Sequence, residues 1–165
     1  KDELRYQRFH KTFLHFKYDN LSLAHLWADD YVKISPYKTH LIDGAIDVLL
    51  HLKKDYQLHI ITNGFKEVQH IKLYESNLNS FFNHVIISEE HGYSKPDLKI
   101  FDIAQQITGA QTHECVMIGD NFDADILGAL NAQWKAIYLS NDEIQNLNKN
   151  FIQINRLKEL KGLFL

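Results

Sequence analysis

The sequence predicts an α/β fold of three layers, in which helices cover both faces of a parallel β-sheet. After Pro36, short apolar runs alternate with segments of helical periodicity. Strands that are separated by single helices pair in parallel through right-handed crossovers. Before Pro36 the pattern is helical throughout. We therefore expect a small helical element over residues 1–37 and an α/β core over residues 38–165.

Two helices are predicted in the first part of the chain. Their apolar residues recur at helical spacing, as Tyr6, Phe9, Phe13 and Phe16 in the first and as Leu23, Leu26, Trp27, Tyr31 and Ile34 in the second. Aromatic residues at this spacing usually face the interior, so we expect the same of Trp27 and Tyr31. Asp19 and Asn20 mark the turn. The second helix should end at Ser35, because a residue before proline avoids the α region.

The core follows as an alternation of helices and strands. Helices are expected at about 44–52, 65–74, 96–107 and 122–130, and strands at 57–61, 85–87, 115–118, 136–139 and 151–154. Pro96 fits the first turn of the third of these helices, and Gly109 fits its end. Cys115, within an apolar run, is expected to be a small buried hydrophobic residue.

Composition excludes several classes of protein. A length of 165 residues suits about one domain with a small appendage. The net charge of −3 argues against a nucleic-acid-binding surface, so an anionic substrate would be held by local positive groups or by a metal. A single cysteine excludes a disulfide framework and suits a reducing compartment, which predicts a cytoplasmic location. No apolar run approaches the ~20 residues of a membrane span. The ten histidines form no zinc motif.

Polar residues of a consistent kind follow three of the predicted strands. Thr62-Asn63-Gly64 offers a hydroxyl and backbone N–H groups that could hold a phosphate oxygen, although such threonines often only cap a helix. Lys95, in Ser94-Lys95-Pro96-Asp97, could neutralise a phosphate or could be an ordinary surface lysine. Asp120 and Asp125 belong to the acidic stretch 119–125, which suits Mg²⁺ but could also be a solvated turn. Ligands bind at such strand ends in open α/β sheets.

In this order, the three segments resemble the signatures of the haloacid dehalogenase-like hydrolase superfamily, most of whose members are phosphatases. Thr62 ends a hydrophobic strand as in the second signature, Lys95 matches the third, and the Gly-Asp pair 119–120 with Asp125 matches the fourth. The resemblance covers about residues 41–139 and implies a Rossmann-like core. It is closest to nucleotidase-like phosphatases with a small helical cap, of which the first two helices would be the remnant.

The resemblance also implies a role for each matching residue. Thr62 would bind the transferring phosphoryl group, and Asn63 could give it a backbone N–H. Lys95 would pair with both the phosphate and the nucleophilic carboxylate. Asp120 would ligate Mg²⁺, and Asp125 would lie near the metal, either through water or by orienting Lys95. This set suits phosphoryl transfer, which requires a metal and a cation to neutralise the phosphate oxygens.

One signature of the family has no match in the chain. The pattern Asp-x-Asp-x-Thr/Val, which carries the nucleophile and the general acid/base, belongs on a first strand that the family places between the strands ending at Thr62 and Asp120. Asp29-Asp30 lies within a helical pattern and does not fit. The chain begins at Lys1 without methionine and looks like a piece of a longer protein. We expect it to be inactive as given, with the strand supplied by another chain or by residues outside this sequence.

The sequence thus predicts a Mg²⁺-dependent phosphatase that acts on a small phosphorylated metabolite, with a nucleoside monophosphate as one candidate. Haloacid dehalogenase chemistry is disfavoured, because that branch uses no metal and usually lacks the Gly-Asp pair. A sugar phosphomutase stays open, since the same signatures serve it. The alternative of another class is a non-catalytic fragment or regulatory module. A phosphorelay receiver domain is disfavoured, because there the acid precedes Thr and Lys in the chain.

Overall fold

The computed structural model describes residues 2–142 and 150–164. The chain divides into two compact units. The first comprises residues 1–40 and 67–77, and the second comprises residues 41–66 and 78–165. The domain division expected after residue 37 stays a prediction. No helix in the described ranges has both the length and the apolar character that crossing a membrane requires.

The first unit contains the two helices expected from the sequence. α1 spans Asp2–His15 and α2 spans Leu21–Ile34. Asn20 caps the second helix, because its side chain accepts a hydrogen bond of 2.9 Å from the backbone N–H of Leu23. α2 ends before Pro36, as expected, and continues only as a short 3₁₀ turn, Ser35–Tyr37.

The aromatic side chains of this helix pair are more exposed than their spacing indicates. Phe13 is buried and makes an edge-to-face contact with Trp27, with ring centroids 4.9 Å apart. Trp27 and Tyr31 are nevertheless about half exposed, and Phe16 is mostly exposed. The expectation that all of these residues face the interior is therefore wrong. The physical reason is that each helix of a packed pair buries only a narrow stripe of its surface against the other helix. The apolar stripes of α1 and α2 are wider than this contact, so their outer residues stay exposed.

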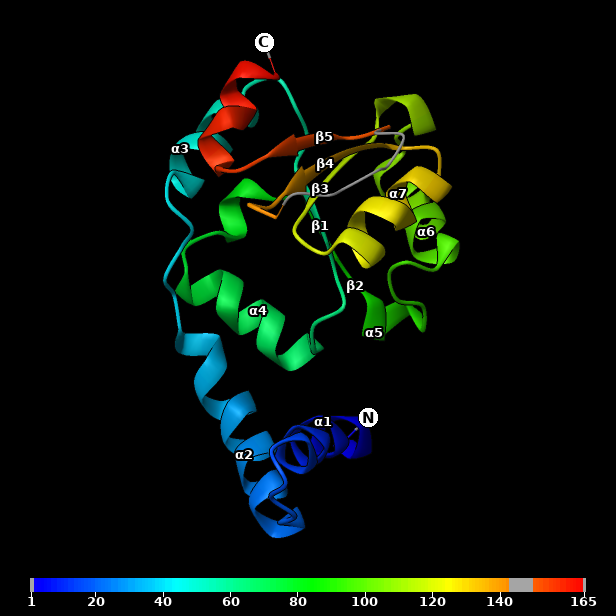
Figure 1. Ribbon diagram of the computed structural model, residues 1–165. Coiled ribbons are helices and arrows are strands. Elements are labelled where there is room, and N and C mark those ends of the chain that lie inside the picture. Colours follow the sequence, from blue (N-terminus) through cyan, green and yellow to red (C-terminus); the bar gives the residue numbers. More distant parts are fainter. Residues whose placement is uncertain (1, 143–149, 165) are drawn as a thin grey trace. The chain divides into compact units, whose positions relative to one another are not determined.

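The second unit is built on parallel strands, as the sequence predicts. β1, His59–Thr62, pairs in parallel with β2, His84–Ile87. A three-stranded parallel sheet has the order β3-β4-β5, formed by Val116–Gly119, Lys135–Leu139 and Ile152–Ile154 (Figure 1). Within the described ranges, β1 and β3 belong to separate sheets and are not hydrogen-bonded to each other.

Helices cover both faces of the three-stranded sheet, which confirms the three-layer architecture. Along β4, Ala136 and Tyr138 join a core cluster with residues of α6, Leu98–Thr108, and α7, Gly128–Asn131. The residue between them, Ile137, joins a second cluster with residues of α3 and of the C-terminal 3₁₀ helix. These two elements span Ala45–Leu52 and Leu157–Gly162 and lie on the opposite face of the sheet (Figure 1). This alternation is what a strand buried on both faces requires.

The loops after the strands differ from the prediction in three places. Pro96 lies before α6 and not in its first turn, since Asp97 caps the helix by accepting a hydrogen bond from Lys99 N. A short helix α5, Ser88–His91, follows β2 directly and was not predicted. The helix expected at 122–130 begins as a π-helix, Phe122–Leu127, and becomes α-helical only at α7.

α4, Lys66–Glu75, agrees with its predicted range within about one residue.

Candidate active site

Thr62 is the last residue of β1, directly opposite Ile87 of β2 in the parallel register. Its hydroxyl accepts a hydrogen bond of 3.0 Å from the backbone N–H of Gly64. This contact closes a tight turn after the strand and fixes the position of the Thr62 oxygen. The hydroxyl hydrogen remains available to an acceptor, because the contact with Gly64 uses only a lone pair.

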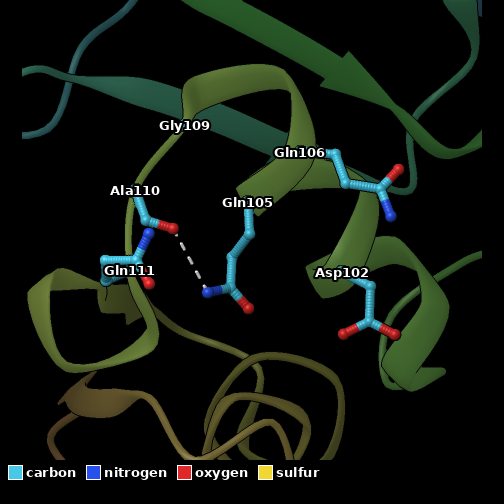
Figure 2. A pocket seen from close by; sticks show the side chains of 6 residues that line it. All are labelled: Asp102, Gln105, Gln106, Gly109, Ala110 and Gln111. Atoms are coloured by element: carbon cyan, nitrogen blue, oxygen red, sulfur yellow. Dashed lines mark hydrogen bonds between the residues drawn. The ribbon is translucent and has the colours of Figure 1, made fainter.

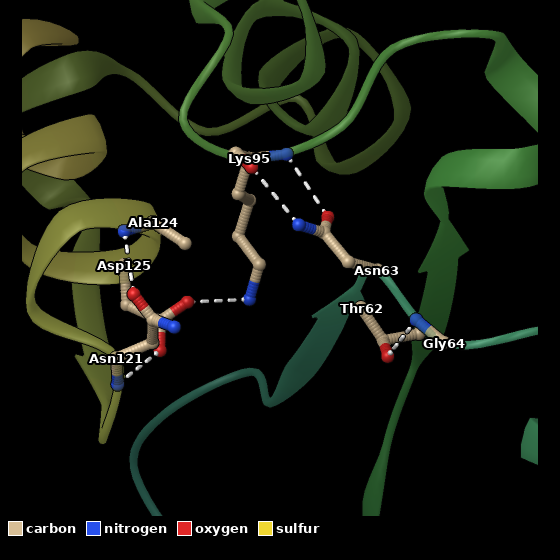
Figure 3. A network of polar contacts seen from close by, with 7 residues as sticks. All are labelled: Thr62, Asn63, Gly64, Lys95, Asn121, Ala124 and Asp125. Carbon is tan, nitrogen blue, oxygen red and sulfur yellow. Dashed lines mark hydrogen bonds and ion pairs between the residues drawn. The ribbon is translucent and has the colours of Figure 1, made fainter. Parts of the chain in front are cut away.

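Asn63 joins the loop after β1 to the loop that carries Lys95. Its side-chain nitrogen donates to the carbonyl of Lys95, and its side-chain oxygen accepts from the backbone N–H of Lys95, both at 2.9 Å. Figure 3 shows this pair of bonds. Segments from two different strand ends are therefore held together by one side chain.

The Lys95 side chain extends from this loop to Asp125. Its Nζ lies 2.6 Å from Oδ1 of Asp125, and the two side chains are only 10% and 7% exposed (Figure 3). A hydrogen bond between two charged groups is short and strong. The pair joins the loop after β2 to the π-helix after β3, so Lys95 is not the ordinary surface lysine that the sequence left open.

The second oxygen of Asp125 is also engaged. Oδ2 accepts a hydrogen bond of 3.0 Å from the backbone N–H of Asn121. Asn121 in turn caps the π-helix through its side-chain oxygen, which accepts from Ala124 N at 2.8 Å. Asn121 was not singled out from the sequence, although an asparagine just before a helix start is a known capping signal. π-Helical turns are rare in proteins, and those that occur are often found at functional sites.

The residue before the first acid of this stretch, Gly119, must be a glycine for a steric reason. A Cβ built at this position would overlap Oδ2, Cβ and Cγ of Asp125. Asp125 therefore lies directly against the backbone of the last residue of β3. The Gly-Asp pair noted in the sequence has a steric reason as well as a chemical one.

Asp120 and Asp123 are both exposed, on either side of Asn121. The structure describes no hydrogen bond or ion pair for the Asp120 carboxylate within the ranges it covers. Among the described residues there is no group of three or more His, Cys, Asp or Glu side chains placed to hold a metal. Mg²⁺ needs only one or two carboxylates, together with waters and substrate phosphate. The donor set thus fits Mg²⁺ ligation by Asp120, whereas Asp125 already uses both oxygens in protein contacts.

His59 and Cys115, which lie outside this network, have shifted pKa values. Burial, together with the nearby His84 ring, lowers the pKa of His59. The two rings stack with centroids 5.3 Å apart at the start of β1 and β2, at the opposite end of these strands from Thr62. Burial and the neighbouring Glu114 raise the pKa of the Cys115 thiol, so this thiol stays protonated. Cys115 is buried, as predicted.

A shallow hollow of about 430 Å³ lies at the C-terminal end of α6 (Figure 2). It is lined by Asp102, Gln105, Gln106, Gly109, Ala110 and Gln111. None of these residues was predicted as a site residue. Gln105 already donates to the Ala110 carbonyl and to the Thr112 hydroxyl, at 3.3 and 3.1 Å. The polar groups that suit an anion are therefore those at the strand ends and not those of this hollow.

Comparisons with known proteins find relatives among phosphatases and nucleotidases. Glyceraldehyde 3-phosphate phosphatase of Methanothermobacter thermautotrophicus is 38% identical over 115 residues, which are 69% of this chain and 50% of that protein. Pyrimidine 5'-nucleotidase PynA of Streptococcus pneumoniae is 34% identical over 148 residues, which are 88% of this chain and 62% of that protein. The chain spans about half the length of the curated relatives it matches.

A solved structure with the same fold is that of the HAD-hydrolase YfnB of Bacillus subtilis, crystallised with bound magnesium. It matches 99% of this chain and 72% of its own chain, with 27% identity and a TM-score of 0.86. The family described as haloacid dehalogenase-like hydrolase matches residues 5–133. Since this match covers well over half of the sequence, the chain belongs to the haloacid dehalogenase-like hydrolase family.

Proposed function

We propose that the protein to which this chain belongs hydrolyses phosphate monoesters of small metabolites with the help of Mg²⁺. The observation that supports this most is the placement of Lys95. Its ammonium is held by Asp125, and its backbone is held beside the Thr62 loop by Asn63. A fixed cation on a loop that is bonded to the turn after Thr62 suits a phosphoryl group, whose equatorial oxygens carry the charge to be neutralised.

We assign the roles of the residues from the resemblance to the family, together with their contacts in this chain. Thr62 would donate its hydroxyl hydrogen to a phosphate oxygen, and the backbone N–H of Asn63 would be a second donor. Lys95 would neutralise the same group. Asp120 would hold Mg²⁺, which supplies charge neutralisation and orients the phosphate. Asp125 would act by fixing Lys95, since both of its oxygens are already hydrogen-bonded within the protein.

The nucleophile of the proposed reaction is an aspartate outside this chain, on a strand between β1 and β3. Two features support this part of the proposal. β1 and β3 lie in separate sheets within the described residues, so each has an edge without a strand partner there. The polar side chains at their carboxyl ends are nonetheless linked through Lys95. The strand would come from further residues of the same protein or from another chain, and this chain alone would be inactive.

The substrate class to test first is nucleoside monophosphates, because two of the relatives are pyrimidine 5'-nucleotidases. Sugar and triose phosphates follow, since another relative is a glyceraldehyde 3-phosphate phosphatase. The experiment measures phosphate release by the natural full-length protein from a panel of these esters, with Mg²⁺ and with EDTA. Magnesium-dependent release that Lys95→Met abolishes would support the proposal. A protein that releases no phosphate from any ester, with or without Mg²⁺, would instead support the non-catalytic alternative.

A further inference from the structure

We infer that Asn63 is a positioning residue, whose side chain holds the backbone of Lys95 so that the ammonium and the Thr62 hydroxyl face the same anion. This inference rests on the proposed function for its catalytic consequence, but not for the structural link itself. The inference goes beyond the role of Asn63 as a hydrogen-bond donor to phosphate. The Asn63 side chain binds the backbone of Lys95, so only the backbone N–H of Asn63 is left to bind the phosphate.

The sheet register brings the two loops together. β1 and β2 are parallel neighbours, and their last residues, Thr62 and Ile87, are directly paired. The segments 63–66 and 88–95 therefore leave the same end of the same two strands. Lys95 is separated from β2 by seven residues, however, so the register alone does not fix its position relative to Thr62.

The Asn63 side chain supplies the missing constraint. An amide has one carbonyl oxygen and one NH₂ group, and here each binds the complementary group of the same residue, Lys95. Exchanging the oxygen and nitrogen would place donor against donor and acceptor against acceptor. The orientation is therefore determined by Lys95 itself. Two hydrogen bonds, one to each of the two peptide groups that flank the Lys95 Cα, restrict rotation as well as distance.

The same two segments are joined at a second point. Glu89 accepts a hydrogen bond of 2.9 Å from the backbone N–H of Lys66, and Glu90 forms an ion pair of 2.9 Å with the Lys66 ammonium. The loop between Thr62 and α4 is thus attached to the segment after β2 near both of its ends. Of the two attachments, only the one through Asn63 acts on Lys95.

Lys95 is consequently held at both ends, by Asn63 at its backbone and by Asp125 at its ammonium. Without Asn63 the ammonium could still reach Asp125, because the lysine side chain is flexible. Its position relative to Thr62 would then vary. A displacement of about 1 Å at a catalytic group can cost about a hundredfold in rate.

The chain offers a matched control in Asn83, at the other end of β1 and β2. The side-chain oxygen of Asn83 accepts a hydrogen bond of 3.3 Å from the backbone N–H of Leu58, and the backbone N–H of Asn83 donates to the Leu58 carbonyl at 2.8 Å. Asn83 therefore also links the backbones of the segments that flank these strands, but away from the candidate site. Replacing it by alanine removes the side-chain bond and keeps the backbone bond, so this variant reports the cost of losing an asparagine side-chain link without touching Lys95.

The test compares Asn63→Ala, Asn63→Asp and Asn83→Ala in the natural full-length protein, with amide exchange of Lys95 measured by NMR. Asn63→Ala should speed exchange of the Lys95 N–H at least about tenfold, the factor that corresponds to the loss of one hydrogen bond of about 1.4 kcal/mol. Asn63→Asp keeps the acceptor, so the Lys95 N–H should stay protected. This second variant preserves the test if the alanine variant fails to fold. Unchanged exchange in Asn63→Ala, or an equal increase in Asn83→Ala, would overturn the inference.

Kinetics separate positioning from direct binding. Asn63→Ala should lower kcat at least about tenfold, with little change in KM, and Asn83→Ala should leave both unchanged. A raised KM at unchanged kcat would mean that the side chain binds substrate, and would contradict the inference. If the wild-type protein releases no phosphate from any ester, the proposed function fails. The exchange of the Lys95 amide would still decide whether Asn63 holds this residue.

Discussion

The ammonium of Lys95 lies 2.6 Å from a carboxylate oxygen of Asp125, in a place where both side chains are nearly buried. Neither charge can be removed alone without leaving the other in a poorly solvated position. A buried pair of this kind contributes little net stability when it is intact, but breaking it is costly. The two residues therefore depend on each other for folding as well as for the proposed chemistry.

Replacing Lys95 by methionine tests this dependence. The free energy of unfolding should fall by about 3–5 kcal/mol, because Asp125 would keep a buried charge without its partner. Adding Asp125→Asn should recover most of that loss, while phosphate release stays absent in both variants. Urea denaturation of the full-length protein measures the change. Lys66→Met is the control, since its pair with Glu90 is more exposed, at 55% and 27% for the two side chains, and a pair near the surface is worth about 0–1 kcal/mol. A loss no larger than that of the control would contradict the account.

Gly119→Ala should damage the site through sterics alone. The added Cβ would overlap the Asp125 carboxylate, so Asp125 or the strand must shift, at a cost of about 1–3 kcal/mol. Phosphate release should fall together with stability. Gly162→Ala is the matched control, because a Cβ at this position would meet no atom within 4 Å. Thermal unfolding and activity are measured for both. Equal behaviour of the two variants would show that the contact with Asp125 is unimportant.

Asp120→Asn should weaken the dependence on magnesium. The half-saturating Mg²⁺ concentration for phosphate release should rise about tenfold or more, which corresponds to about 1.4 kcal/mol of lost binding. Asp123→Asn removes an exposed carboxylate three residues away and should leave that concentration nearly unchanged. A titration of activity with Mg²⁺ compares them. If Asp123→Asn had the larger effect, the metal ligand would have been assigned to the wrong acid.

Stability should fall as the pH drops below about 6.5, in part because of His59. Burial and His84 lower its pKa in the folded state, so the unfolded chain binds more protons between that pKa and the ordinary value near 6.5. The contribution of His59 is therefore complete above pH 6.5 and is lost as the pH falls towards the folded pKa. His59→Phe keeps a ring there and removes the titration, so stability should depend less steeply on pH. The same slope in His59→Phe as in wild type would exclude this role.

The sequence predicts most of the core because its signals are local. The apolar runs that become β1 to β5 and the periodic segments between them are recognisable without tertiary information. The same holds for the positions of Thr62, Lys95 and Asp120, which lie at the end of a strand or in the segment after one. The family confirmed by the comparisons was already indicated by the order of these three segments.

The remaining features depend on contacts between distant residues. The bonds from Asn63 to Lys95 span 32 residues, and no pattern in either segment indicates them. The π-helix at Phe122–Leu127 looks like an ordinary amphipathic helix in the sequence, because both present an apolar face. The exposure of Trp27 and Tyr31 was also missed, since periodicity marks a face as apolar but does not say whether anything covers it.

The most direct test of the account is a crystal structure of the full-length protein with Mg²⁺ and a phosphate-mimicking anion such as tungstate. We expect one anion within about 2.7–3.2 Å of both the Thr62 hydroxyl and the Lys95 ammonium, with Asp120 bound to the metal beside it. An anion that contacts only one of Thr62 and Lys95, or that binds away from these strand ends, would contradict the account.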